Sequence, residues 1–177
     1  MMDFIQNPKR NSVSKADALD ESVIGLKLFD TPLIGYADAA DALFERFKTD
    51  PEITGGRFMQ PLEWLHDAHT VVSIFMPYSR EIKSGNRRDM ITPSNEWLHA
   101  RYEGQKLVNE LSRYLIDELT KRGYQCVAPG IDDRFKSFLG TGTSEKKGHV
   151  NSDYGSNWSE RMWPLLPDWE RLGCRRD

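Results

Sequence analysis

The longest stretch of the sequence with periodic apolar residues lies between Thr92 and Gly123, and any fold of this chain must accommodate it. Apolar residues recur there at helical spacing, which predicts one helix over residues 94–122. Thr92 is suited to cap its first turn, Pro93 to occupy the first helical position, and Gly123 to end it. We expect His99 and Arg101 to point away from the core. The predicted buried stripe comprises Trp97, Leu98, Tyr102, Leu107, Val108, Leu111, Leu115 and Leu119.

Three shorter segments have the composition of strands. The strongest is His69–Met76 (HTVVSIFM), whose apolar run is continuous and therefore predicts a strand covered on both faces. Ser22–Phe29 and Tyr124–Val127 are the other two. A helical pattern from Ala37 to Asp50 separates the first two strands, after a break at residues 31–35. This alternation predicts a layered α/β domain with a small mixed central sheet.

Composition excludes several classes of protein. The 177 residues carry a formal net charge of −3, which argues against a surface that binds nucleic acid throughout. Cys126 and Cys174 are too few for a disulfide framework, a zinc site or an iron–sulfur cluster. Residues 1–20 are polar and predict a flexible arm rather than a signal peptide. We therefore expect a cytoplasmic protein without a membrane span.

Two local patterns resemble ligand sites but fit them poorly. His66 and His69 are three residues apart, yet they have no third ligand nearby, and His69 begins a predicted strand, so we predict no metal site. The glycine-rich stretch Gly140–Gly148 (GTGTSEKKG) lacks the order of a phosphate-binding loop. We predict a surface loop there.

A basic segment offers a third pattern. Residues 79–91 are expected to form a loop with four cationic side chains, which could hold a phosphate or a nucleic-acid backbone, although most such loops are simply solvated. No combination of residues forms a convincing catalytic triad. The four cationic residues are Arg80, Lys83, Arg87 and Arg88.

Four segments, taken in order, resemble a known family. They are Trp64–Tyr78 (WLHDAHTVVSIFMPY), Ala100–Leu119 (ARYEGQKLVNELSRYLIDEL), Tyr124–Gly130 (YQCVAPG) and Asp153–Arg161 (DYGSNWSER). The order resembles that of the N-terminal half of the epoxyqueuosine-reductase-like iron–sulfur proteins, whose corrinoid domain is related to that of reductive dehalogenases. The resemblance covers about residues 22–161.

The resemblance implies a fold, a cofactor and a reaction. Members have a corrinoid-binding α/β domain with a nitroreductase-like fold, followed by a module with two [4Fe–4S] clusters. Electrons pass from the clusters to cobalt and then to the substrate. The best-known reaction reduces epoxyqueuosine to queuosine in tRNA, which implies tRNA contact by analogy.

The resemblance also assigns residues. The position of the family's catalytic acid falls on Tyr154, with Asp153 one residue away, and a tyrosine serves as proton donor in related dehalogenases. Glu160 and Arg161 match the family's Glu-Arg pair. With Arg101 and Tyr102 they form the set that the resemblance assigns to cofactor binding.

The last sixteen residues, Met162–Asp177, depart from the family. The family continues with a helix and a G-L-G-x-x-G loop, whereas this chain reads MWPLLPDWERLGCRRD. A single-base shift near codon 161 allows these residues to be recoded as HVAFAAGLGTFGLSKG, which restores that loop. We therefore expect residues 1–20 as an arm, 21–161 as the family's N-terminal domain, and 162–177 as an out-of-frame tail that replaces the cluster module.

Three functions remain open at this point. The first is a truncated corrinoid reductase, inactive alone because it lacks the [4Fe–4S] module. The second is a non-enzymatic module that forms a homodimer through uncovered apolar surface. The third is a flavin-binding, nitroreductase-like protein. Fold analogy alone does not choose among them.

Overall fold

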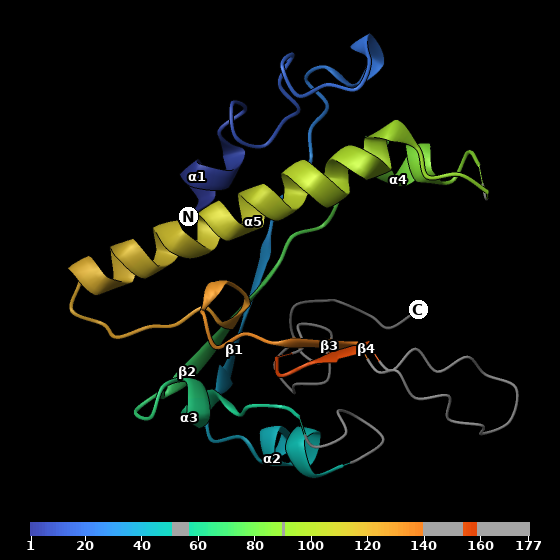
Figure 1. Ribbon diagram of the computed structural model, residues 1–177. Coiled ribbons are helices and arrows are strands. Elements are labelled where there is room, and N and C mark those ends of the chain that lie inside the picture. The colour runs from blue at the N-terminus through green and yellow to red at the C-terminus, as the bar shows by residue number, and fades with distance from the viewer. Residues whose placement is uncertain (51–56, 90, 140–153, 159–177) are drawn as a thin grey trace, which may run out of the picture. The chain divides into compact units, whose positions relative to one another are not determined.

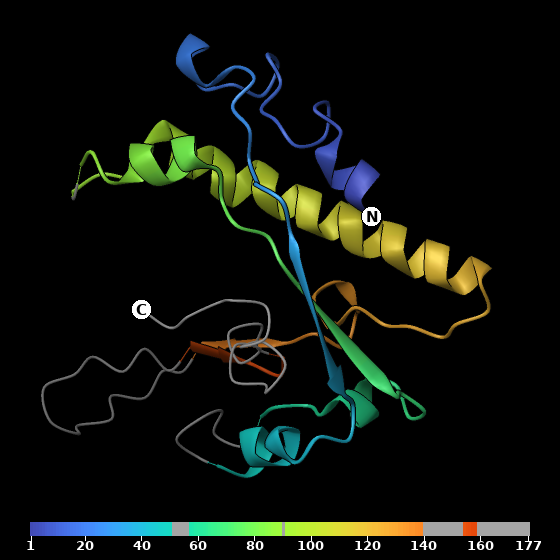
Figure 2. The same cartoon turned by 180° about the vertical axis from the view of Figure 1, so that it is seen from behind.

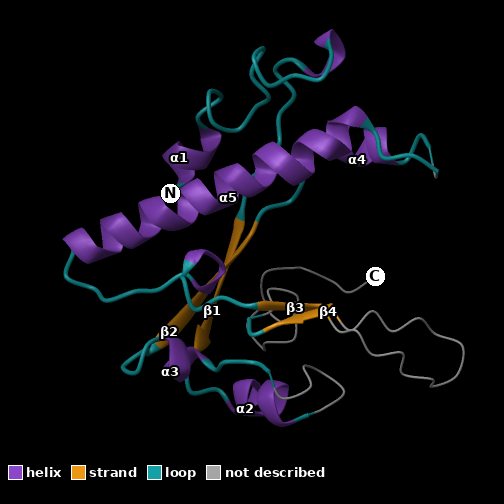
Figure 3. Ribbon diagram, in the orientation of Figure 1, coloured by secondary structure: helices purple, strands orange, loops and turns teal. Residues whose placement is uncertain are grey.

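The computed structural model describes residues 1–50, 57–89, 91–139 and 154–158 of the chain (Figure 1). These residues form a mixed α/β structure, as predicted (Figure 3). Its α-helices are α1 (Met2–Gln6), α2 (Ala42–Thr49), α3 (Pro61–Trp64), α4 (Arg80–Asn86) and α5 (Asn95–Lys121). Its strands are β1 (Leu33–Asp38), β2 (Thr70–Phe75), β3 (Ser137–Leu139) and β4 (Tyr154–Ser156).

The chain divides into two compact units, and each is described by itself. Unit 1 comprises Met1–Ile34 and Ile74–Gln125, and unit 2 comprises Gly35–Ser73 and Cys126–Asp177. Strands β1 and β2 form one two-stranded sheet, and the division falls within both. Strands β3 and β4 form an antiparallel sheet in unit 2. The single mixed sheet that we predicted is therefore wrong for the described residues, which form two small sheets instead.

Helix α5 confirms the longest predicted element. Its N-cap lies two residues later than predicted, because Ser94 rather than Thr92 caps the helix and accepts the Trp97 N–H at 3.2 Å. Thr92 instead donates its hydroxyl to Asp89. At the other end Gly123 has a φ of 86°, a left-handed conformation that glycine adopts without strain.

The buried face of α5 differs in part from the predicted stripe. Leu107 and Leu111 are buried as expected, but Leu98 and Tyr102 are 43% and 67% exposed. The buried line instead continues through small or polar residues at helical spacing, namely His99, Ala100 and Gly104. A search for large apolar residues misses such a line.

Gly104 allows an aromatic ring to reach the α5 backbone. A Cβ atom at this position would lie 3.1 Å from Cζ of Phe29, closer than a normal carbon–carbon contact. Phe29 is 4% exposed, and its ring stacks on Tyr78 with centroids 5.2 Å apart. The ring therefore has little room to move away. The core of unit 1 gathers around it and contains Val13, Leu28, Phe29, Ile82, Ala100 and Leu107.

The N-terminal segment, for which we predicted a flexible arm, packs against α5. Ile5 and Val13 are each 1% exposed. The Phe4 ring stacks on Tyr114 of α5 with centroids 4.6 Å apart. In both views of the chain α1 lies alongside α5 (Figures 1 and 2).

The predicted strand over residues 22–29 is wrong. The structure has a 3-10 helix at Glu21–Val23, followed by isolated bridges from Lys27 to Ser12 and from Phe29 to Tyr78. Gly25, with a φ of 77°, interrupts the extended backbone. The regular strand follows at β1, where we expected a break.

Two further elements differ from the prediction. Helix α2 begins after its N-cap Asp41, which accepts the Leu43 N–H at 2.8 Å, so the helix starts later than Ala37. The predicted strand Tyr124–Val127 is not a strand in the structure, and it leads instead to a 3-10 helix at Pro129–Ile131.

The basic segment after β2 is helical, contrary to the predicted loop. Ser79 caps α4 by accepting the Ile82 N–H at 3.3 Å, and Ile82 is fully buried. The polar composition of the segment concealed a short amphipathic turn with Ile82 and Gly85 on its inner side.

Strand β2 confirms the strongest strand prediction, but the predicted cover on both of its faces is wrong. Val72 and Phe75 are 50% and 47% exposed, so the strand is not covered on both faces. Among the residues that the structure describes, its sheet has one other strand, β1.

Unit 2 has an aromatic core of its own. The Phe58 ring stacks on Trp158 with centroids 5.6 Å apart, and Phe47 meets Phe58 edge-on. Trp64 contacts Trp158 edge-on from α3. Phe44 of α2 completes the buried cluster. None of the helices in the described residues is long and apolar enough to cross a membrane.

Replacing Gly104 with leucine tests the contact with Phe29. We expect Gly104→Leu to lower the free energy of unfolding by about 1–3 kcal/mol, because the added side chain overpacks a ring that cannot move away. Urea denaturation followed by circular dichroism measures the change.

Gln105→Leu is the matched control, since Gln105 is the next residue of α5 and is exposed. Both changes place the same helix-forming residue in the same helix. Equal stability of the two variants would contradict the proposed close packing at Gly104.

Candidate functional site

The structure describes half of the predicted site residues. Arg101 and Tyr102 lie in α5 of unit 1, and both are exposed. The prediction that Tyr102 faces the core is therefore wrong. Nζ of Lys106 lies 4.7 Å from the centroid of the Tyr102 ring, so the exposed aromatic face already holds a cation.

The predicted acid begins a strand of unit 2. Tyr154 is the first residue of β4, and its backbone is in register with Leu139 of β3. Asp153, Glu160 and Arg161 lie outside the described residues, as do the stretch 140–148 and the tail 162–177.

The four cations of the basic segment are placed on and after α4. Arg80, Lys83 and Arg87 follow one another at helical spacing and are exposed. Arg88 instead pairs with Glu96 of α5 at 2.5 Å. Part of the charge that we considered for anion binding is therefore neutralised within unit 1.

The two histidines considered as metal ligands lie in the connection between α3 and β2 and share no helix. His66 follows α3 and contacts Asp67, its neighbour in sequence, at 2.9 Å, whereas His69 directly precedes β2. Within the described ranges, no three residues of the ligand types His, Cys, Asp and Glu gather into a candidate metal site.

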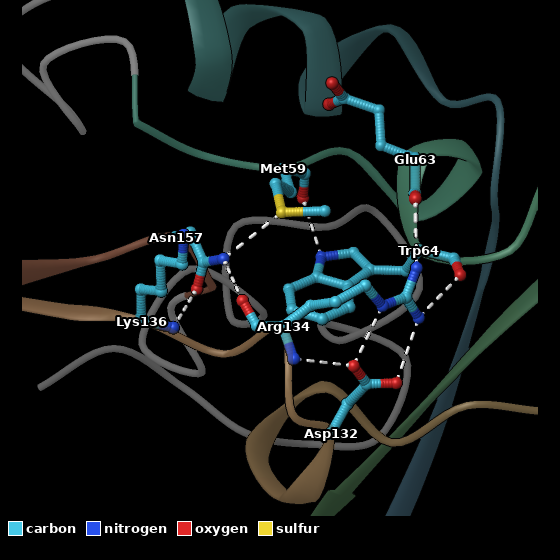
Figure 4. A network of polar contacts seen from close by, with 7 residues as sticks. All are labelled: Met59, Glu63, Trp64, Asp132, Arg134, Lys136 and Asn157. Atoms are coloured by element: carbon cyan, nitrogen blue, oxygen red, sulfur yellow. Dashed lines mark hydrogen bonds and ion pairs between the residues drawn. The ribbon is translucent and has the colours of Figure 1, made fainter.

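Sequence reasoning missed a polar network in unit 2, drawn in Figure 4. Its centre is Asn157, which is 5% exposed. The side-chain Oδ1 accepts the Lys136 N–H at 2.8 Å, and Nδ2 donates to the Arg134 carbonyl at 2.8 Å. The backbone N–H donates to the Lys136 carbonyl, and the backbone carbonyl accepts the Met59 N–H. Asn157, the residue directly after β4, thus joins the segment at Met59 to the segment at residues 134–136.

An ion pair beside Asn157 fixes the same segment to α3. Nε and Nη2 of Arg134 contact the two carboxylate oxygens of Asp132 at 2.8 and 2.9 Å. Nη2 also donates to the Trp64 carbonyl at 3.0 Å, and the guanidinium lies 5.0 Å from the centre of the Trp64 ring. Hydrogen bonds from Arg134 lower the pKa of Asp132 to about 2. A bidentate pair of this kind fixes geometry as well as charge.

A buried histidine forms the second feature that sequence reasoning missed. We expected His99 to point away from the core, but it is 3% exposed. Its Nδ1 lies 2.9 Å from Oε2 of Glu103, and its Nε2 accepts the Leu19 N–H at 3.1 Å. The i, i+4 spacing of His99 and Glu103 was the available signal.

Comparison of the chain with models of known families, with curated proteins and with solved structures finds no match.

The Asp132–Arg134 pair predicts a pH dependence of stability. Because the pKa of Asp132 is lower in the folded chain than in the unfolded chain, the pair stabilises the fold above about pH 4. This stabilisation is lost as the pH falls from about 4 to about 2. We expect Asp132→Asn to remove that part of the pH dependence, as measured by urea denaturation at each pH.

Asp133→Asn is the control, because Asp133 is the exposed neighbour in the same turn. The assignment to Asp132 would be contradicted if the loss of unfolding free energy between about pH 4 and about pH 2 persisted in Asp132→Asn but disappeared in Asp133→Asn.

Proposed function

We propose that this chain is the corrinoid-binding half of an epoxyqueuosine-reductase-like protein of the cytoplasm, with a nitroreductase-like fold. The observation that carries the proposal is the order of the four segments between Trp64 and Arg161. In that family the cobalt of the corrinoid carries electrons from the clusters to the substrate.

The described residues of the proposed cofactor set suit the edge of a corrin ring. A corrinoid carries amide groups around its macrocycle, and their carbonyl oxygens accept hydrogen bonds. The guanidinium of Arg101 and the phenol of Tyr102 are donors of the right kind, and both are exposed. We propose that they contact these amides. The resemblance also assigns Glu160 and Arg161 to cofactor binding, and these two lie outside the described residues.

The acid of the proposed reaction is Tyr154, with Asp153 beside it. The hairpin β3–β4 holds the Tyr154 backbone, and the buried amide of Asn157 follows three residues later. A phenol in this place would donate a proton to the substrate. The tRNA substrate of the family enters the proposal by analogy only.

The electron source of the proposed reaction lies outside these residues. A cubane cluster takes four cysteine thiolates, and the 177 residues contain only Cys126 and Cys174. We therefore propose that the chain by itself binds the corrinoid without turning over.

Exposed apolar residues on the β1–β2 sheet favour a second candidate, the self-associating module. Within unit 2, Tyr36 of β1 is 57% exposed and Val72 of β2 is 50% exposed. Among the described residues this sheet has two strands, and a two-stranded sheet is marginally stable by itself and favours pairing with further strands. A homodimer through this sheet would cover them.

Titration with hydroxocobalamin tests the first proposal. We expect a saturable change in the visible spectrum of the corrinoid when the chain is added. Arg101→Ala should weaken binding by about tenfold or more, as expected for one charged hydrogen bond.

Arg113→Ala is the matched control, because Arg113 is also exposed on α5 and lies about 18 Å further along the helix. An unchanged spectrum, or equal binding by the two variants, would contradict the proposed site. An unchanged spectrum together with a dimeric mass by light scattering would favour the self-associating module.

A further inference from the structure

The hydrogen bonds of His99 define which of its nitrogens carries the proton. The partner of Nε2 is a backbone N–H, that of Leu19, which can only donate. Nε2 must therefore be the acceptor, and the neutral ring carries its proton on Nδ1. That proton points at the carboxylate of Glu103, 2.9 Å away. The geometry is satisfied only by the neutral Nδ1–H form of the ring.

The partner of Nε2 belongs to a segment far away in sequence. Leu19 is 80 residues before His99, in the stretch 14–20 that precedes the first 3-10 helix. The next residue, Asp20, accepts hydrogen bonds from Ser22 and from Asn95 of α5. Leu19 itself is 61% exposed, so water can reach its N–H once the contact opens. These two contacts attach residues 14–20 to the first turns of α5.

We propose that His99 is a pH-sensitive latch that holds Leu19 on α5 while its ring is neutral and releases Leu19 when Nε2 is protonated. Protonation turns Nε2 into a donor that faces the Leu19 N–H, so the hydrogen bond is lost and two hydrogens meet. This latch does not depend on the proposed corrinoid function.

Of the two hydrogen bonds of the His99 ring, we expect protonation to break only the one with Leu19. Glu103 accepts from Nδ1–H in both states of His99, so it keeps the ring in place. On the facing segment Asp17 accepts the hydroxyl of Ser14 at 2.6 Å. Hydrogen bonds from Ser22 and Asn95 hold the pKa of Asp20 below its ordinary value, so Asp20 stays ionised while histidines titrate.

Release would be local, because other contacts of the N-terminal segment contain no histidine. The Arg10 guanidinium pairs with Glu110 of α5 at 3.1 Å. The Val13 N–H donates to the Leu26 carbonyl at 3.0 Å, both within unit 1. We therefore expect the backbone around Leu19 to open, while the Asp20–Asn95 and Val13 contacts, which contain no histidine, stay closed.

NMR of the full chain from about pH 8 to about pH 5 tests the latch. The ¹⁵N shifts of His99 report its tautomer and its protonation, and hydrogen exchange reports the protection of the Leu19 amide, corrected for the intrinsic pH dependence. We expect the Nδ1–H tautomer at high pH. Leu19 protection should fall about two- to tenfold as the ring is protonated, while Val13 protection is unchanged.

Three results would overturn the proposal. His99 could fail to titrate in this range, Leu19 protection could stay constant while His99 titrates, or Val13 could lose protection together with Leu19. His99→Gln provides a non-titrating comparison, because glutamine offers both a donor and an acceptor. Leu19 protection in this variant should not follow pH as it does in the wild type, and the wild-type measurement stands even if the variant does not fold.

Discussion

In each unit one buried asparagine side chain makes hydrogen bonds to the backbone of a segment that is distant in sequence. In unit 1 the amide of Asn11 exchanges two hydrogen bonds with Phe29, since Oδ1 accepts its N–H at 2.9 Å and Nδ2 donates to its carbonyl at 2.8 Å. In unit 2 the Asn157 side chain accepts the Lys136 N–H and donates to the Arg134 carbonyl and to the sulfur of Met59. Leaving such a buried group unpaired costs about 1–3 kcal/mol.

The two asparagines position what we propose to be functional. Asn11 fixes Phe29, whose ring lies against Gly104 and so defines the buried face of α5. Tyr102 lies away from this buried face and is exposed. Asn157 fixes the end of the β3–β4 hairpin on which the proposed acid, Tyr154, stands. Asn11 and Asn157 therefore stabilise the segments that also carry the proposed functional residues.

The sequence predicted those elements whose signals are local and strong. Helix α5 has a long periodic pattern and a glycine stop, and β2 has a run of β-branched residues, and both are confirmed. Helix α4 was missed because its buried side has one large apolar residue, Ile82, beside a glycine, Gly85. The face of α5 was misjudged because its close contact needs a residue with no side chain, Gly104, rather than a large apolar one.

The candidate site was less accessible to sequence reasoning than the fold. Arg101, Tyr102 and Tyr154 came from a resemblance, and their roles stay proposals. The contacts of Asn157 and Arg134 join residues up to 98 apart, so no local pattern indicates them. His99 had a local signal in its i, i+4 spacing to Glu103, but its second partner, Leu19, is distant in sequence.

Exchange of the side-chain amide protons, followed by ¹⁵N NMR, tests most directly whether the two asparagines hold the units closed. Asn11 and Asn157 are each 5% exposed, whereas Asn7 is exposed and serves as the internal reference. We predict that the amide protons of Asn11 and Asn157 exchange at least about tenfold more slowly than those of Asn7, because exchange requires the buried bonds to open. Exchange of all three at the same rate would contradict the account.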